Sequence, residues 1–136
     1  MQQKKTIVVL DTNILLVPGQ FRVDIFSEID RLCHFPYELR VCRGTLDELD
    51  KIIRTASGRD KAAARLARQL LAAKKVRAIV PAATKMLLNT DRFIADFAAR
   101  NRCIVATLDR ELQKNLLKEG LRCIVLRGKD HLELKG

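Results

Sequence analysis

The chain has 136 residues, 48% of them hydrophobic, and carries a formal net charge of +10 at pH 7. This length and composition suit one compact domain over residues 1–136. No apolar run reaches the ~18 residues that a membrane-spanning helix needs, and the apolar run near the amino terminus is too short for a secretory leader. We therefore expect a cytoplasmic protein without a membrane partner.

The positive charge lies in the second part of the chain. Residues 1–57 carry 8 basic and 8 acidic side chains, whereas residues 58–136 carry 18 basic and 8 acidic ones. An excess of this kind favours an acidic partner, with nucleic acid first. A well-charged, soluble surface with no such partner is the other interpretation.

The four cysteines are scattered, form no CxxC pair and are accompanied by only two histidines. This pattern argues against a structural zinc site. Each cysteine lies in or beside an apolar run, which is typical of a small hydrophobic core residue in a reducing compartment.

Short apolar runs alternate with longer amphipathic stretches along the chain. In order, the pattern predicts a strand at 7–10, a helix at 23–32, a strand at 39–42, helices at 45–54 and 58–75, a strand at 76–80, a helix at 91–100, a strand at 103–106, a helix at 109–119 and a strand at 123–126. Residues 131–134 leave room for a further short edge strand. Thr45 and Glu48 form a capping-box pattern that places a helix start at Thr45, and Gly120 suits the end of the helix before it.

Strand–helix alternation of this kind predicts an α/β fold. We expect a three-layer α/β/α sandwich with a mainly parallel five-stranded sheet and helices on both faces. Such sheets place their sites beyond the carboxyl ends of the strands.

Four acidic residues are candidates for that edge. Asp11 directly follows the first strand, and Asp109 follows the fourth. Glu48 lies early in the helix after the second strand, while Asp91 reaches the edge only if its helix also begins there. Taken singly, each aspartate is more often a helix cap and the glutamate a capping-box or solvent-facing residue. Together they would repel one another unless a divalent cation such as Mg²⁺ or Mn²⁺ offset their charge.

Other site chemistries fit the sequence poorly. No GxGxxG follows the first strand, no GxxxxGK[ST] is present, and no serine or Cys–His nucleophile motif stands out. An acidic cluster combined with a basic surface favours metal-assisted hydrolysis of a phosphodiester, in which no protein nucleophile is required.

The acids also carry a family resemblance. DTN at 11–13, Glu48 within TLDEL, Asp91 within DRFIADFA, and TLD at 107–109 resemble, in order, spacing and context, the PIN-domain nucleases. The stretches VDIFSEIDRL, TLDELDKI, IVATLDREL and GKDHLEL are most similar to archaeal relatives of the PIN nuclease of small-subunit rRNA processing. Toxin ribonucleases of the VapC type share the same acids.

The resemblance implies a sheet in the order 3-2-1-4-5 and a metal-dependent endoribonuclease that cleaves single-stranded RNA. It implies that Asp11, Glu48, Asp91 and Asp109 bind one or two Mg²⁺ or Mn²⁺ ions. Asn13 would orient Asp11 or a metal-bound water, and Thr107 would hold a water or a phosphate oxygen. An rRNA precursor, a second copy of the chain, and a ribosome-assembly or antitoxin protein are the partners that the resemblance suggests.

The sequence departs from the rRNA-processing pattern at one place. Those relatives often have two adjacent aspartates at the third acidic position, but here Thr90 precedes Asp91. Asp96 is a candidate to substitute for the missing carboxylate, and Glu111 is a candidate to reach the metal.

Basic residues suggest where RNA would lie. Residues 58–77 hold 7 basic side chains and one acidic one. Helical spacing places Lys61, Arg65, Arg68 and Lys75 on one face, either as a track for phosphates or as a solvated surface. Arg92 and Arg110 adjoin proposed metal ligands and are candidates for holding the backbone next to them.

Two interpretations outside this enzyme class remain open. A non-catalytic RNA-binding or assembly module would have the same fold and bind RNA without metal. A receiver-type phosphoacceptor would need an acidic pair after the first strand and a lysine after the fifth; here Asp11 stands alone, and Arg127 and Lys129 follow the fifth strand.

Overall fold

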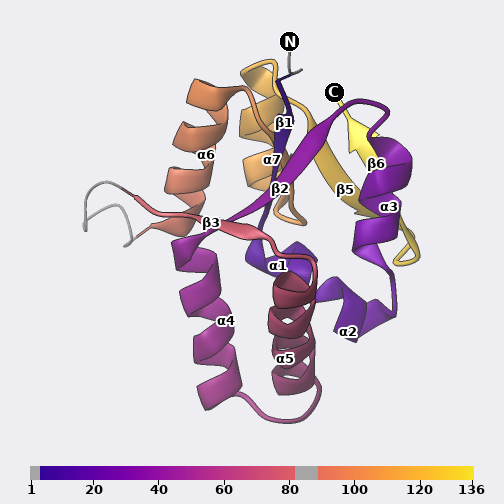
Figure 1. Ribbon diagram of the computed structural model, residues 1–136, viewed down its shortest axis with the longest axis vertical. Coiled ribbons are helices and arrows are strands. Elements are labelled where there is room, and N and C mark those ends of the chain that lie inside the picture. The colour runs from indigo at the N-terminus through magenta and orange to yellow at the C-terminus, as the bar shows by residue number, and fades with distance from the viewer. Residues whose placement is uncertain (1–3, 82–88) are drawn as a thin grey trace.

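The computed structural model describes residues 4–81 and 89–136. Figure 1 shows a sheet with helices on both of its faces and a pair of helices extending below it. The strands are β1 (Thr6–Leu10), β2 (Tyr37–Cys42), β3 (Arg77–Ile79), β4 (Ile104–Ala106), β5 (Cys123–Arg127) and β6 (His131–Lys135). The helices are α1 (Thr12–Leu15), α2 (Val17–Phe21), α3 (Ile25–Leu32), α4 (Arg43–Thr55), α5 (Gly58–Ala73), α6 (Thr90–Asn101) and α7 (Arg110–Lys118).

The sheet has the order β3-β2-β1-β4-β5-β6. The first five strands are parallel in the predicted order, and β6 pairs antiparallel with β5 at the edge. The predicted mainly parallel three-layer fold is confirmed, but the sheet has six strands because 131–135 form the edge strand. The sixth strand follows a tight connection in which Gly128 and Lys129 have positive φ, so the chain reverses directly after β5.

Two hydrophobic clusters fix the layers. On one face of the sheet, Val8 and Leu10 of β1 pack in a cluster with α1, α2, α3, α4 and α5. On the other face, Val9 of β1 packs in a cluster with α6 and α7. Side chains that alternate along β1 therefore pack against the helices on both faces of the sheet, and all three residues are fully buried.

Several boundaries differ from the prediction. The helix predicted to start at Thr45 begins at Arg43, because β2 runs straight into α4 and the extended residue Cys42 occupies the N-cap. The prediction that Thr45 caps this helix is therefore wrong. Its side chain is buried, and among the described residues its hydroxyl has no hydrogen-bond partner. The short helices α1 and α2 fill a stretch for which no element was predicted.

Among the described residues, no helix has the length and apolar character required to cross a bilayer. The four cysteines are free and buried, as predicted for core residues. Within the same part of the chain, Val80 is the one large apolar side chain that is strongly exposed.

Candidate active site

The carboxyl ends of β1 and β4 and the first turns of α4, α6 and α7 meet at one edge of the sheet (Figure 1). Asp11 lies at the end of β1, Glu48 in the second turn of α4, Asp91 in the first turn of α6, and Asp109 at the N-cap of α7. Asp91 was expected at this edge only if its helix begins there, and α6 does begin at this edge.

Asp11 is the most buried of the four acids, with 4% of its surface exposed. Its side chain caps α1, and its Oδ1 accepts a hydrogen bond from the Thr12 amide at 2.8 Å. Its Oδ2 accepts a hydrogen bond from the Thr107 hydroxyl at 2.7 Å. Each carboxylate oxygen has two lone pairs, so each retains one for a further ligand.

Thr107 contacts Asp11 from the neighbouring strand end. Its side chain is fully buried, and its hydroxyl donates a hydrogen bond to Asp11 Oδ2. The same oxygen accepts a hydrogen bond from the Asp109 amide at 3.1 Å. Thr107 therefore links Asp11 to the start of α7.

Asn13 also ties the two ends of the site together. Its Oδ1 accepts a hydrogen bond from the Leu108 amide at 3.0 Å and lies 3.4 Å from the Thr107 hydroxyl. A hydroxyl can donate only one hydrogen bond, and the shorter distance indicates that Thr107 donates it to Asp11 rather than to Asn13. Asn13 thus positions the loop between β4 and α7, which in turn holds Thr107 against Asp11.

Two further positioning residues were missed by sequence reasoning. The Thr12 hydroxyl donates to Glu48 Oε2 at 2.5 Å, which holds the exposed glutamate toward β1. The buried Gln113 side chain donates to the Thr107 carbonyl at 2.7 Å. The Thr of DTN was a visible signal for the first contact, whereas no local pattern marks Gln113.

The four carboxylates influence one another electrostatically. Burial is the main cause that raises the pKa of Asp11; hydrogen bonds from Thr107 and Thr12 oppose it, and the charges of Asp91 and Glu48 add to it. Burial also raises the pKa of Asp91, with contributions from Asp109 and Glu48. In the described part of the chain no lysine or arginine forms an ion pair with any of the four.

Two depressions adjoin these acids. One lies between α4 and α6 and is lined by Glu48 and Asp91 together with two basic residues of α4, Lys51 and Arg54. The other lies between α6 and α7 and is lined by Asp91, Arg92, Asp109 and Glu111. Lys51 and Arg54 were missed, although Lys51 lies three residues after Glu48 and Arg54 three residues after Lys51, so successive residues are neighbours on the helix surface.

A close approach of two helices sets the first depression. Gly44 in the first turn of α4 is buried, and a methyl group added there would overlap Oγ1 of Thr90 in the first turn of α6. Thr90 thus occupies a packing position beside Asp91, at the place where the resembling proteins often have an acid.

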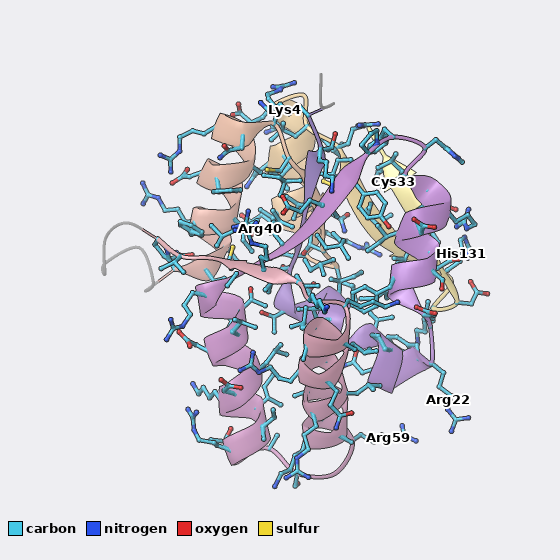
Figure 2. The ribbon with its side chains drawn as sticks, in the orientation of Figure 1. Lys4, Arg22, Cys33, Arg40, Arg59 and His131 are labelled. Carbon is cyan, nitrogen blue, oxygen red and sulfur yellow. The ribbon has the colours of Figure 1, made fainter. Side chains whose placement is uncertain are left out.

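The remaining predicted residues lie elsewhere. Asp96 is exposed and lines neither depression, because five residues along a helix turn a side chain by about 140° from Asp91. Lys61, Arg65 and Arg68 lie on α5, apart from both depressions, and Arg68 forms an ion pair with Asp50 at 3.0 Å. Figure 2 shows Arg59 at the end of α5 that lies far from the sheet.

The donor set suits a hard divalent cation with retained waters. Among the described residues, no three acidic, histidine or cysteine side chains already converge as metal ligands, so the expected four-ligand cage is not preassembled. Mg²⁺ commonly takes one or two carboxylates and keeps several waters. Mutually repelling carboxylates with free lone pairs meet that requirement.

Comparisons with known proteins agree with this fold. Residues 8–129 match the family model described as a PIN-like domain. Ribonuclease VapC4 of Methanocaldococcus jannaschii is 29% identical over 132 residues, which cover 95% of this chain and 96% of that protein. The solved PIN domain endonuclease Utp24 aligns with a TM-score of 0.73 at 18% identity, over 94% of this chain and 90% of that one. A domain of a functionally unknown protein from M. jannaschii aligns with a TM-score of 0.59 at 15% identity, over 90% and 92% of the two chains.

Proposed function

Because the chain belongs to the PIN-like domain family, we propose that it is a metal-dependent endoribonuclease that cleaves single-stranded RNA. The observation that carries this proposal is the acidic edge, where burial and neighbouring carboxylates together raise the pKa of Asp11 and Asp91. Such an arrangement destabilises the ionised protein, and a bound cation would offset the cost.

In this function Asp11, Glu48, Asp91 and Asp109 would hold Mg²⁺ or Mn²⁺. The ion, when bound, supplies an activated water and offsets the charge that develops on the phosphate. The chain itself fixes the ligands: Thr107 and Thr12 donate to the two oxygens of Asp11, and the Thr12 hydroxyl donates to Glu48.

Basic residues at the two depressions would hold the RNA backbone. Lys51 and Arg54 line the same depression as Glu48 and Asp91, and Arg92 lines the neighbouring one. Contacts of this kind recognise phosphates and carry no base information, so they suit cleavage directed by RNA shape or by a partner protein.

An rRNA precursor is the substrate that we propose within this class. The support is the sequence likeness of VDIFSEIDRL, TLDELDKI, IVATLDREL and GKDHLEL to the rRNA-processing relatives. A toxin ribonuclease is the second candidate, and the identity to Ribonuclease VapC4 favours it. Growth arrest on expression, relieved by the product of an adjacent gene, would support the toxin; cleavage of a precursor rRNA at one position would support processing.

The test of the enzyme is cleavage of an end-labelled single-stranded RNA with Mn²⁺, followed on denaturing gels. We expect cleavage by the wild-type protein, none with EDTA, and a rate at least about 100-fold lower for Asp11→Asn. Asp96→Asn is the matched control, since it removes an exposed carboxylate of α6 outside both depressions, and it should cleave at the wild-type rate.

Two results would overturn the proposal. Cleavage by Asp11→Asn at the wild-type rate would show that the acidic edge is not the site. RNA binding by the wild-type protein with no cleavage in any divalent cation would assign the chain to the non-catalytic class.

A further inference from the structure

A third hollow, of about 640 Å³, lies on the flank of α7 that faces away from the acidic edge. Its charged lining residues are all basic, and all are exposed: Arg110, Lys114, Lys118, Arg127 and Lys135. Five of the 18 basic residues of the second part of the chain therefore lie beside one helix and one hairpin. We refer to this surface as the α7 groove.

The geometry of α7 arranges three of these side chains in a row. Arg110, Lys114 and Lys118 are spaced four residues apart and so lie along one side of the helix, over about 12 Å. Lys135 is in register with Cys123 at the start of β5, and Arg127 ends that strand. The two hairpin residues therefore border the groove along its length, opposite the row on α7.

The charges of the α7 groove are largely unneutralised. Among the described residues, Arg127 forms an ion pair with Glu133 at 3.1 Å, and the other four basic residues form none. The basic face of α5 likewise has one paired residue, since Arg68 pairs with Asp50. The α7 groove differs because its cations border a hollow from two sides, so a polyanion lying there would contact both rows at once.

The groove starts where the acidic edge ends. Arg110 is the first residue of α7 and directly follows its N-cap, Asp109. Glu111 and Asn115, on the opposite flank of the same helix, line the depression between α6 and α7. A strand of RNA leaving the acidic edge would cross the first turn of α7 and enter the groove.

We propose that the α7 groove binds the phosphate backbone of single-stranded RNA and leads the strand to the acidic edge. This inference rests on the proposed nuclease function for the identity of the polyanion. Among the residues that the structure describes, no aromatic side chain lines the groove, so base stacking does not contribute there. Binding is then sequence-independent and salt-sensitive.

The test compares two variants that remove the same charge. Lys114→Gln with Lys118→Gln changes the α7 groove, and Lys61→Gln with Arg65→Gln changes α5. The affinity of each full-length protein for a fluorescein-labelled single-stranded RNA is measured by anisotropy between 0.05 and 0.5 M KCl, in EDTA so that cleavage does not interfere.

We expect the loss of affinity in the α7 pair, relative to the wild-type protein, to be about 25-fold larger at 0.05 M KCl than at 0.5 M KCl. The slope of log K against log salt should become shallower by about 1.4, which is the value for two lost single-strand phosphate contacts. The α5 pair should stay within about twofold of the wild-type protein. Thermal melts of both pairs establish that the variants are folded.

Three results would overturn the proposal: an α7 pair that binds as the wild type, an α5 pair that loses as much affinity, or a wild-type protein that does not bind RNA. Displacement of the RNA by polyglutamate at equal charge concentration would assign the groove to an acidic protein instead. Binding that depends on the groove without any cleavage in Mn²⁺ would leave this inference standing while removing the proposed nuclease.

Discussion

At the scale of single residues, the burial of Asp11 affects both the stability of the metal-free fold and the proposed binding of a cation. Its carboxyl is almost fully buried, and burial raises its pKa, although hydrogen bonds from Thr107 and Thr12 oppose the shift. A carboxyl with a raised folded-state pKa contributes its full stability below the pKa of an unfolded aspartate. That contribution is lost as the pH rises through the folded-state value. Above that pH, the cost of ionising the buried Asp11 carboxyl therefore lowers the stability of the metal-free protein.

Replacing this carboxylate by an amide should consequently stabilise the metal-free fold. We expect Asp11→Asn to raise Tm by a few degrees at pH 7 in EDTA, since about 1 kcal/mol corresponds to roughly 3–4 °C at this size. The amide oxygen can still accept from the Thr12 amide, and the NH₂ group can donate to the Thr107 hydroxyl. Differential scanning fluorimetry provides the measurement.

Addition of Mn²⁺ completes that comparison. The ion should raise the Tm of the wild-type protein because it binds the folded state alone, and it should leave the Tm of Asp11→Asn unchanged. A variant that melts well below the wild type in EDTA would contradict this account of Asp11.

At the scale of elements, the sequence predicted the order of strands and long helices because their hydrophobic periodicity extends over many residues. It did not predict α1 and α2, which have four and five residues and are too short to show a helical period. It placed the start of α4 at Thr45 because local capping patterns describe a helix after a turn, whereas β2 continues directly into this helix.

The site was predictable to a similar degree. The four carboxylates could be predicted from strand ends and family spacing, since each belongs to a local motif. The hydrogen bonds that hold them could not be predicted. Thr107 lies 96 positions from Asp11, and only the pairing of β1 with β4 brings the two together. Contacts of this range depend on sheet order, which local patterns do not encode.

The approach of α4 to α6 gives a second testable prediction. In Gly44→Ala, the added methyl would overlap Oγ1 of Thr90, so one of the helix starts has to move. Overpacking costs about 1–3 kcal/mol, and the higher helix propensity of alanine returns up to about 1 kcal/mol. We expect a modest loss of stability and at least a tenfold loss of Mn²⁺-dependent cleavage, because Glu48 and Asp91 lie on these two helices.

The double variant Gly44→Ala with Thr90→Ala provides the control. It removes the overlapping hydroxyl and should recover most of the cleavage rate and of the stability measured in urea. Wild-type cleavage by the single Gly44→Ala variant would show that the spacing of the helix starts does not matter.

At the scale of the whole molecule, the central sheet divides the core into two hydrophobic clusters. Cys33 belongs to the cluster with α3, and Cys42, Cys103 and Cys123 belong to the one with α6 and α7. Burial raises the pKa of Cys42 to about 12 and those of Cys103 and Cys123 to about 11. The thiols therefore report on the opening of both layers.

We expect the native protein to react slowly with a thiol reagent at pH 8, because few thiols are ionised and all are buried. All four should react rapidly in denaturant. If the two layers open together, Cys33 of one cluster and Cys123 of the other should be modified at one rate that follows global unfolding, which mass spectrometry of the labelled peptides can resolve. Rapid native labelling of either residue would show that one layer opens alone.

The position of β1 in the sheet has a consequence for the newly made protein. β1 is synthesised first but lies between β2 and β4, and β4 begins only at Ile104. Asp11, Thr107 and Asp109 therefore come together late, after most of the chain has left the ribosome. A nuclease assembled in this order would be inactive as a nascent chain, and the ribosome that makes it would be spared its activity.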